Sequence, residues 1–173
     1  MAIKITFLGA GSSVFVRNVL GDCIIHPELE DLTFALYDID AQRLEDSYLM
    51  LHAICAHYGK SVKMEKYVGV EELPQALTGA NFLICAIQVG GYDPCTISDF
   101  EIPKKYGLRQ TIADTLGVGG VFRALRTIPV MEMFGKMAEK YCPNTVFLNY
   151  SNPMGMLSGY MERYCNIQFV GLC

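Results

Sequence analysis

Two glycines and one carboxylate carry the clearest chemical signal in this 173-residue sequence. Gly9-Ala10-Gly11 directly follows the apolar run Ile3–Leu8, and Asp38 directly follows a second apolar run at residues 32–37. Glycines after a buried parallel strand let the backbone approach a pyrophosphate, and a carboxylate after the next strand accepts hydrogen bonds from ribose hydroxyls. The pattern predicts dinucleotide binding. NAD is preferred over NADP, because Asp38 and the nearby Asp40 would repel a 2′-phosphate.

The glycine motif is incomplete, since Val14 stands where the third glycine of G-x-G-x-x-G would lie. That departure affects helix–strand packing more than phosphate contact. Ser12 and Ser13, which open the next helix, are expected to lie beside the cofactor. The alternative is an ordinary strand-turn-helix in which Asp38 or Asp40 caps the following helix, and Asp40 is expected to do so in either case.

Apolar runs alternate with segments of helical spacing along the whole chain. Strands are predicted at residues 3–8, 32–37, 62–68, 81–87, 144–149 and 167–171, and helices at 14–25, 41–57, 71–77, 120–140 and 154–163. This alternation predicts an α/β fold with a doubly wound, Rossmann-like parallel sheet of order 3-2-1-4-5-6, related to the fold of lactate and malate dehydrogenases. Residues 93–119 are interpreted as a long functional loop, and Pro129 is expected to kink its helix.

Ligands of such sheets bind beyond the carboxyl ends of the strands, where the winding direction switches between strands one and four. Gln88 and Val89 follow the fourth predicted strand, so they are also expected to contact the cofactor. Arg123 and Arg126 lie one turn apart on the helix at 120–140. They would anchor a substrate or a subunit contact, or form surface ion pairs, and the sequence does not choose between these roles.

Composition excludes several classes of partner. A net charge of −4 argues against non-specific binding to nucleic acid or to an anionic membrane surface. The apolar runs are too short to span a bilayer, and no secretion signal precedes the first strand. Seven cysteines form an odd number without a CxxC pair, which indicates a reducing compartment and predicts a cytoplasmic protein.

Four stretches together resemble glycoside hydrolase family 4, the NAD- and manganese-dependent glycosidases, and most closely its α-galactosidase branch. They are Phe7–Ser12, Ile87–Tyr92, Gln110–Pro129, and Asn149–Met154 together with Gly171–Cys173. The resemblance spans the chain but covers only the first part of the family's usual length. It implies that residues 1–173 are the NAD-binding, N-terminal portion of a longer enzyme that assembles as a dimer or tetramer.

The resemblance also implies an unusual way of cleaving a glycoside. NAD oxidises the C3 hydroxyl of the sugar, the resulting ketone acidifies the C2 proton, and elimination expels the aglycone; water addition and reduction then restore the sugar. A divalent ion, Mn²⁺ in this family, stabilises the enediolate as a Lewis acid. The substrate is therefore expected to be a small-molecule α-galactoside or a related α-glycoside.

Within this resemblance, four residues have implied roles at the substrate and the metal. Cys173 matches the metal-ligand cysteine, Asn152 and Asn149 are expected in the substrate pocket, and Asp114 positions substrate or a metal-bound water. The plainer alternatives are a buried thiol for Cys173, a turn former before Pro153 for Asn152, and a solvated loop residue for Asp114. The catalytic acid and base are expected beyond Cys173.

Two other functions remain open on the sequence. A 2-hydroxy-acid dehydrogenase of the malate or lactate type shares the sheet, the acidic end of strand two and an Asn-Pro after strand five. It would need a His-Asp pair and arginine clamps further along the chain. A non-catalytic NAD-binding module would bind the cofactor without any activity.

Overall fold

The computed structural model describes residues 2–111 and 115–173. Its strands form one parallel sheet of order β3-β2-β1-β4-β5-β6, which confirms the predicted topology. The strands are β1 (Ile3–Leu8), β2 (Leu32–Asp38), β3 (Lys63–Val68), β4 (Phe82–Cys85), β5 (Val146–Asn149) and β6 (Gln168–Gly171). The helices are α1 (Ser13–Ile25), α2 (Ala41–Tyr58), α3 (Leu73–Leu77), α4 (Ile97–Lys105), α5 (Gly117–Tyr141) and α6 (Met154–Tyr164), with short helical turns η1 (Val70–Glu72) and η2 (Gly91–Thr96).

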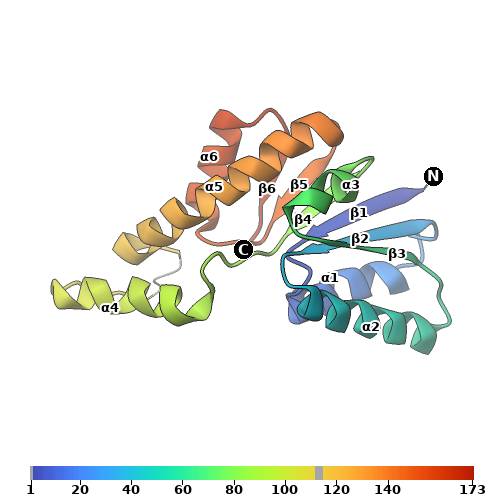
Figure 1. Ribbon diagram of the computed structural model, residues 1–173, viewed down its shortest axis with the longest axis horizontal. Helices are drawn as coiled ribbons and strands as arrows, with labels where there is room; N and C mark the ends of the chain where they lie inside the picture. Colours follow the sequence, from blue (N-terminus) through green and yellow to red (C-terminus); the bar gives the residue numbers. More distant parts are fainter. Residues whose placement is uncertain (1, 112–114) are drawn as a thin grey trace.

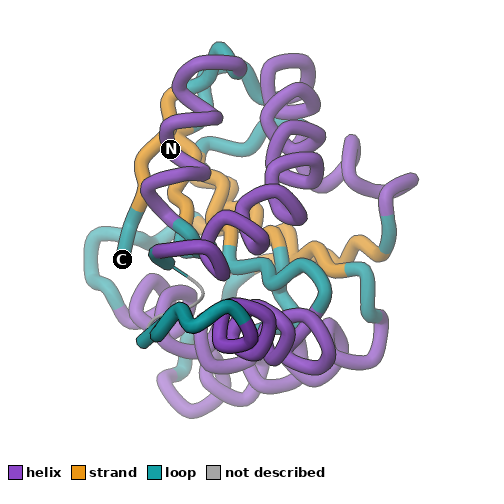
Figure 2. Tube along the Cα trace, turned by 90° about the vertical axis from the view of Figure 1, so that its left-hand side faces the viewer, coloured by secondary structure: helices purple, strands orange, loops and turns teal. Residues whose placement is uncertain are grey.

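Helices cover both faces of the sheet, as Figures 1 and 2 show. On one face, α1 and α2 pack over a core that contains Phe7 and Phe34. On the other face, α3, α5 and α6 pack over a core that contains Leu83 and Phe147. The interior strand β2 is apolar and almost continuously buried, which is the pattern of a parallel strand covered on both faces. Because every strand pair is parallel, the carboxyl ends of all strands lie at one edge of the sheet.

The interpretation of residues 93–119 as a loop is wrong in part, because η2 and α4 lie within it. The error has a physical reason. Asp99 and Pro103 are the buried residues of α4, so its inner face carries a carboxylate and a proline in place of an apolar stripe. The helix packs mainly on α5 and projects away from the sheet (Figure 1). Its stability therefore depends on contacts that the local sequence does not reveal.

Helix α5 begins at Gly117, three residues before the predicted start, and continues through Pro129 to Tyr141. It packs on α3, α4 and α6, and its buried residues include Arg123 and Thr127 as well as apolar side chains. None of the described helices combines the length and the apolar character that crossing a bilayer requires. The seven cysteines are all free.

Candidate functional site

A cavity of about 880 Å³ opens where β1, β4 and β5 end. Its lining contains most of the residues that the sequence predicts at the cofactor and substrate: Gly9, Gly11, Ser12, Asp38, Gln88, Val89 and Asn152. These residues come from four separate chain segments, which the parallel sheet brings to the same edge. The cavity has two parts. The glycine-turn side comprises lining residues within 9–12 and 37–40, and the strand-end side comprises lining residues within 86–91 and 150–152.

The glycine-turn side is held together by backbone groups of β1 and β2. The Gly9 and Ala10 N–H groups both donate to the Tyr37 carbonyl, at 3.0 and 2.9 Å. Gly9 has φ +88°, and a Cβ at this residue would lie 2.7 Å from the Ala86 carbonyl oxygen. Only glycine meets both conditions without strain, since L side chains rarely adopt this backbone region. The first glycine is therefore required for the turn and for the close approach of β4.

Asp38 is bound into the glycine turn. Its Oδ2 accepts the Gly11 N–H at 2.6 Å, and its Oδ1 accepts the Asp40 N–H at 2.9 Å. A Cβ on Gly11 would lie 2.8 Å from Asp38 Oδ2, so the second glycine makes room for the carboxylate. Each carboxylate oxygen keeps a further lone pair for a ribose hydroxyl. Asp40 caps α2 by accepting the Gln42 and Arg43 N–H groups, as predicted, while Asp38 has a different role.

The start of α1 suits a phosphate. Ser12 precedes the helix, makes no side-chain cap hydrogen bond, and leaves a first turn without acidic residues. A helix N-terminus of this kind attracts anions through its N–H groups and its dipole. The turn, Asp38 and this helix start fit a dinucleotide. Ser13 is exposed and does not line the cavity, so its predicted contact with the cofactor remains a prediction.

The strand-end side joins the ends of β4 and β5 through Ser151. The Ser151 hydroxyl accepts the Ile87 N–H at 2.9 Å and lies 3.6 Å from the Cys85 sulfur. Burial raises the pKa of the Cys85 thiol to about 12, so this thiol stays neutral at ordinary pH. The Ser151 hydroxyl thus joins the end of β5 to the end of β4 through uncharged, buried groups that lie below the cavity.

The two predicted asparagines have different surroundings. Asn149 is fully buried, and its amide both accepts the Ser151 N–H and donates to the Ser151 carbonyl, each at 3.0 Å. Asn152 is half-buried and lines the cavity, while its Oδ1 accepts the Met154 N–H at 3.3 Å. Asn152 thus shapes the turn and also faces the cavity. Contact of either asparagine with a substrate stays a prediction.

Cys173 is the one residue of this chain predicted to bind the metal ion. Cys173 lies just after β6 with its side chain exposed, and its role as a metal ligand stays a prediction. Leu172 N–H donates to the Asn149 carbonyl at 2.8 Å, which ties this end of the chain to β5 at the same edge of the sheet (Figure 1). Within residues 2–111 and 115–173, no three His, Cys, Asp or Glu side chains gather closely enough to hold an ion. These residues therefore do not form a metal centre by themselves. Asp114 lies outside the described residues.

Among the cavity residues that the sequence did not assign to the site are three that carry a charge or an aromatic ring. Arg123, left open above, is buried and lines the cavity. Phe15 and Tyr150 also line it, and their rings contact one another at a centroid distance of 5.5 Å. Tyr150 directly follows β5, so its position after a strand was an available signal. Phe15 lies on the first turn of α1, which gives no such signal.

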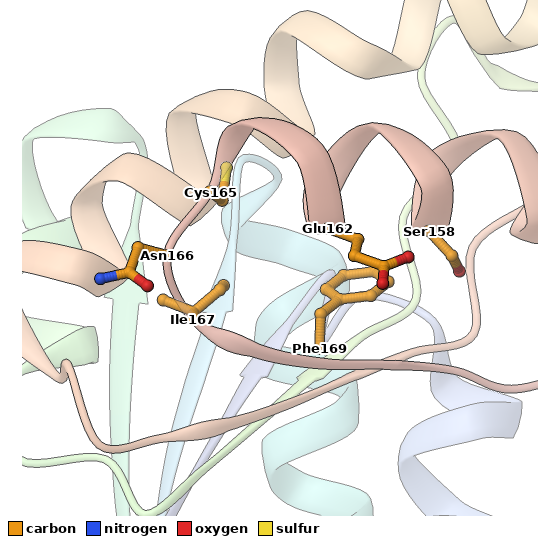
Figure 3. Close-up of a pocket in the computed structure, with 6 residues that line it drawn as sticks. All are labelled: Ser158, Glu162, Cys165, Asn166, Ile167 and Phe169. Carbon is orange, nitrogen blue, oxygen red and sulfur yellow. The ribbon is translucent and has the colours of Figure 1, made fainter.

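A smaller cavity of about 370 Å³ lies between α6 and the segment that enters β6. Figure 3 shows its lining residues, which are Ser158, Glu162, Cys165, Asn166, Ile167 and Phe169. Glu162 supplies its single carboxylate, and the lining contains none of the predicted site residues. The larger cavity is therefore the candidate site.

The parallel sheet, the glycine turn and Asp38 define an α/β domain of the dinucleotide-binding class. The chain belongs to the family 4 glycosyl hydrolases, whose family model matches residues 4–173. It is 55% identical over 170 residues to an alpha-galactosidase of Bacillus subtilis (strain 168), covering 98% of this chain and 39% of that protein. It is 34% identical over 173 residues to an alpha-galacturonidase of Thermoanaerobacter italicus, covering 99% of this chain and 36% of that protein.

Solved structures agree with the fold. A 6-phospho-beta glucosidase from Thermotoga maritima, solved with manganese, NAD+ and glucose-6-phosphate, is 26% identical with a TM-score of 0.83; the match covers 99% of this chain and 40% of that one. A malate dehydrogenase from Picrophilus torridus has a TM-score of 0.70 at 15% identity, covering 99% and 46%, which is a likeness of fold alone. The chain thus spans about two fifths of the length of the curated relatives named above.

Proposed function

We propose that this chain is the NAD-binding, N-terminal portion of an enzyme that hydrolyses α-galactosides or related α-glycosides. The observation that carries the proposal is the joining of Gly11, Asp38 and Asn152 around one cavity in a chain 55% identical to an alpha-galactosidase. The likeness to malate dehydrogenase does not favour the dehydrogenase alternative, because it extends to the fold only. A non-catalytic module is disfavoured by membership of a glycosidase family.

Each predicted cofactor residue would have a separate role in binding NAD. Gly9 and Gly11 bring the backbone close to the pyrophosphate, Ser12 opens the helix on which it rests, and Asp38 accepts the ribose hydroxyls. Gln88 and Val89 form the wall beyond β4. When bound, NAD supplies a hydride acceptor, so that a sugar can be cleaved by oxidation at C3, elimination and water addition rather than by direct displacement.

The substrate side is proposed from the strand-end side of the cavity. Asn152 would hydrogen-bond sugar hydroxyls, because an amide donates and accepts at once. Asn149 supports that turn through Ser151, and Asp114 is proposed to position substrate. Cys173 is proposed as one manganese ligand, completed by residues that the described chain does not contain. The general acid and base are not assigned to any residue of this chain.

The decisive experiment is hydrolysis of an aryl α-galactoside in D₂O by the full-length protein. Turnover is expected to need NAD and Mn²⁺ together, and deuterium is expected at C2 of the released galactose. Unlabelled product, or equal turnover after removal of NAD, would exclude the elimination pathway. Assays with the α-galacturonide, the α-glucoside and their 6-phosphates test the sugar assignment separately.

Cys173 can be tested apart from turnover. Electron paramagnetic resonance titration of Mn²⁺ is expected to show weaker binding in the Cys173→Ala protein, with unchanged binding in Cys23→Ala, whose thiol lies on α1. Equal manganese affinity in all three proteins would remove Cys173 from the metal site.

Assembly as a dimer or tetramer and a cytoplasmic location also belong to this proposal. The seven free thiols support the cytoplasmic location, because free thiols persist in a reducing compartment.

A further inference from the structure

The segment Gln88–Gly91, which lines the strand-end side, is held by residues outside the sheet and outside the cavity lining. Arg126 Nε, on α5, donates to the Val89 carbonyl at 3.0 Å. Gln88 Nε2 donates to the Thr96 hydroxyl at 3.0 Å, and that hydroxyl donates to the Gly91 carbonyl at 3.3 Å. The wall of the cavity after β4 therefore takes its shape from η2 and α5.

Arg126 is in turn oriented by Asp99 on the first turn of α4. Its Nη1 and Nη2 donate to Asp99 Oδ1 and Oδ2, at 3.1 and 2.6 Å. The Asp99 side chain is 3% exposed and that of Arg126 is 22% exposed. Because a guanidinium is planar, a two-point pair with a carboxylate fixes the direction of Nε as well. The pair with Asp99 therefore orients the Arg126 Nε–H group toward the Val89 carbonyl.

Packing leaves the segment little freedom to move toward α5. Gly90 has φ +85°, and a Cβ at this residue would lie 2.8 Å from Cys95 Cβ and 3.2 Å from Arg126 Cδ. The backbone at Gly90 therefore rests directly on η2 and on the Arg126 stem. Hydrogen bonding to Asp99 raises the pKa of Arg126, so the guanidinium keeps its charge at ordinary pH.

We propose that Asp99 and Arg126 are positioning residues for the cofactor: they hold Gln88 and Val89 in the binding-competent position although neither lines the cavity. The inference rests on the proposed NAD binding. Its physical basis is preorganisation, because a segment already fixed before binding has no ordering cost to meet when the ligand arrives. Loss of the pair should weaken NAD binding even where the fold survives.

The test compares variants of the full-length protein by calorimetric titration with NAD and by thermal unfolding. Arg126→Met leaves a buried carboxylate unpaired and should lower both stability and affinity. The double variant Arg126→Met with Asp99→Leu removes that buried charge, so stability should recover while NAD affinity stays about tenfold below wild type, since Val89 still lacks its donor. In turnover, KM for NAD should rise with little change in kcat.

Lys136→Met is the matched control, because Lys136 also lies on α5, pairs with Glu139 and donates to the Tyr164 carbonyl. Its NAD affinity should equal that of wild type. Arg126→Lys keeps the charge facing Asp99 but lacks the planar fork, so it should fold and still bind NAD less tightly. Wild-type affinity in the double variant or in Arg126→Lys would overturn the inference alone. Absence of NAD binding in wild type would overturn the proposed function itself.

Discussion

The two sides of the cavity are built in different ways. On the glycine-turn side, the backbone N–H groups of residues 9–11, directly after β1, bond to the Tyr37 carbonyl and the Asp38 carboxylate of the adjacent strand β2. On the strand-end side, residues 86–91 depend on Ser151 after β5, on Thr96 in η2 and on Arg126 in α5. One side is a property of two neighbouring strands. The other exists only when the helices beyond β4 are in place.

This difference indicates where the site should tolerate change. A side chain at Gly9 should disturb the sheet itself, because Gly9 lies against the backbone of Ala86 directly after β4. Perturbing the strand-end side should alter binding before it alters the fold.

Gly9→Ala should destabilise the protein far more than Gly91→Ala. Both glycines have positive φ, at +88° and +66°, but only Gly9 would bring a Cβ to 2.7 Å from a carbonyl oxygen, whereas nothing lies within 4 Å of a Cβ on Gly91. The expected losses in the free energy of unfolding are about 3 kcal/mol or more for Gly9→Ala and about 1 kcal/mol for Gly91→Ala. Urea denaturation of both variants measures them. Equal losses would show that the two sides are built alike.

Asp38→Ala should reduce NAD affinity about 100-fold, and Gln88→Ala about threefold. Asp38 orders Gly11 and Asp40 and supplies charged acceptors to the ribose, whereas the Gln88 amide is already bonded to Thr96. Calorimetric titration with NAD measures both constants. A larger loss for Gln88→Ala would place the main binding energy on the strand-end side and reverse the contrast.

Alkaline pH should weaken the strand-end side through Cys85. Burial raises the pKa of this thiol from 9.0 to about 12, so between these values the thiol ionises only in the unfolded state. The free energy of unfolding should therefore stay level below pH 9 and fall above it, by at most about 1.4 kcal/mol per pH unit for this group. Urea denaturation at pH 8 to 10 checks this. Cys85→Ala should show a smaller fall, and an unchanged slope would contradict the assignment.

The strand order and most element positions were predictable because they depend on local patterns. Apolar runs such as 32–37 mark buried strands, and Gly9 marks a turn that other residues cannot form. Helix α4 was missed because its buried residues are Asp99 and Pro103, which carry no apolar period. The start of α5 was placed three residues late because Gly117 and its neighbours resemble a loop in sequence.

The candidate site divides in the same way. The sequence alone determined the glycine turn, the carboxylate after β2 and the edge of the sheet where the cavity opens, since strand polarity and backbone freedom are properties of short segments. Only the tertiary structure decided that Asn149 is enclosed while Asn152 faces the cavity, and that Arg126 pairs with Asp99 rather than with solvent. Those outcomes depend on contacts such as Arg126 with Val89, 37 residues apart, whose geometry no local pattern encodes.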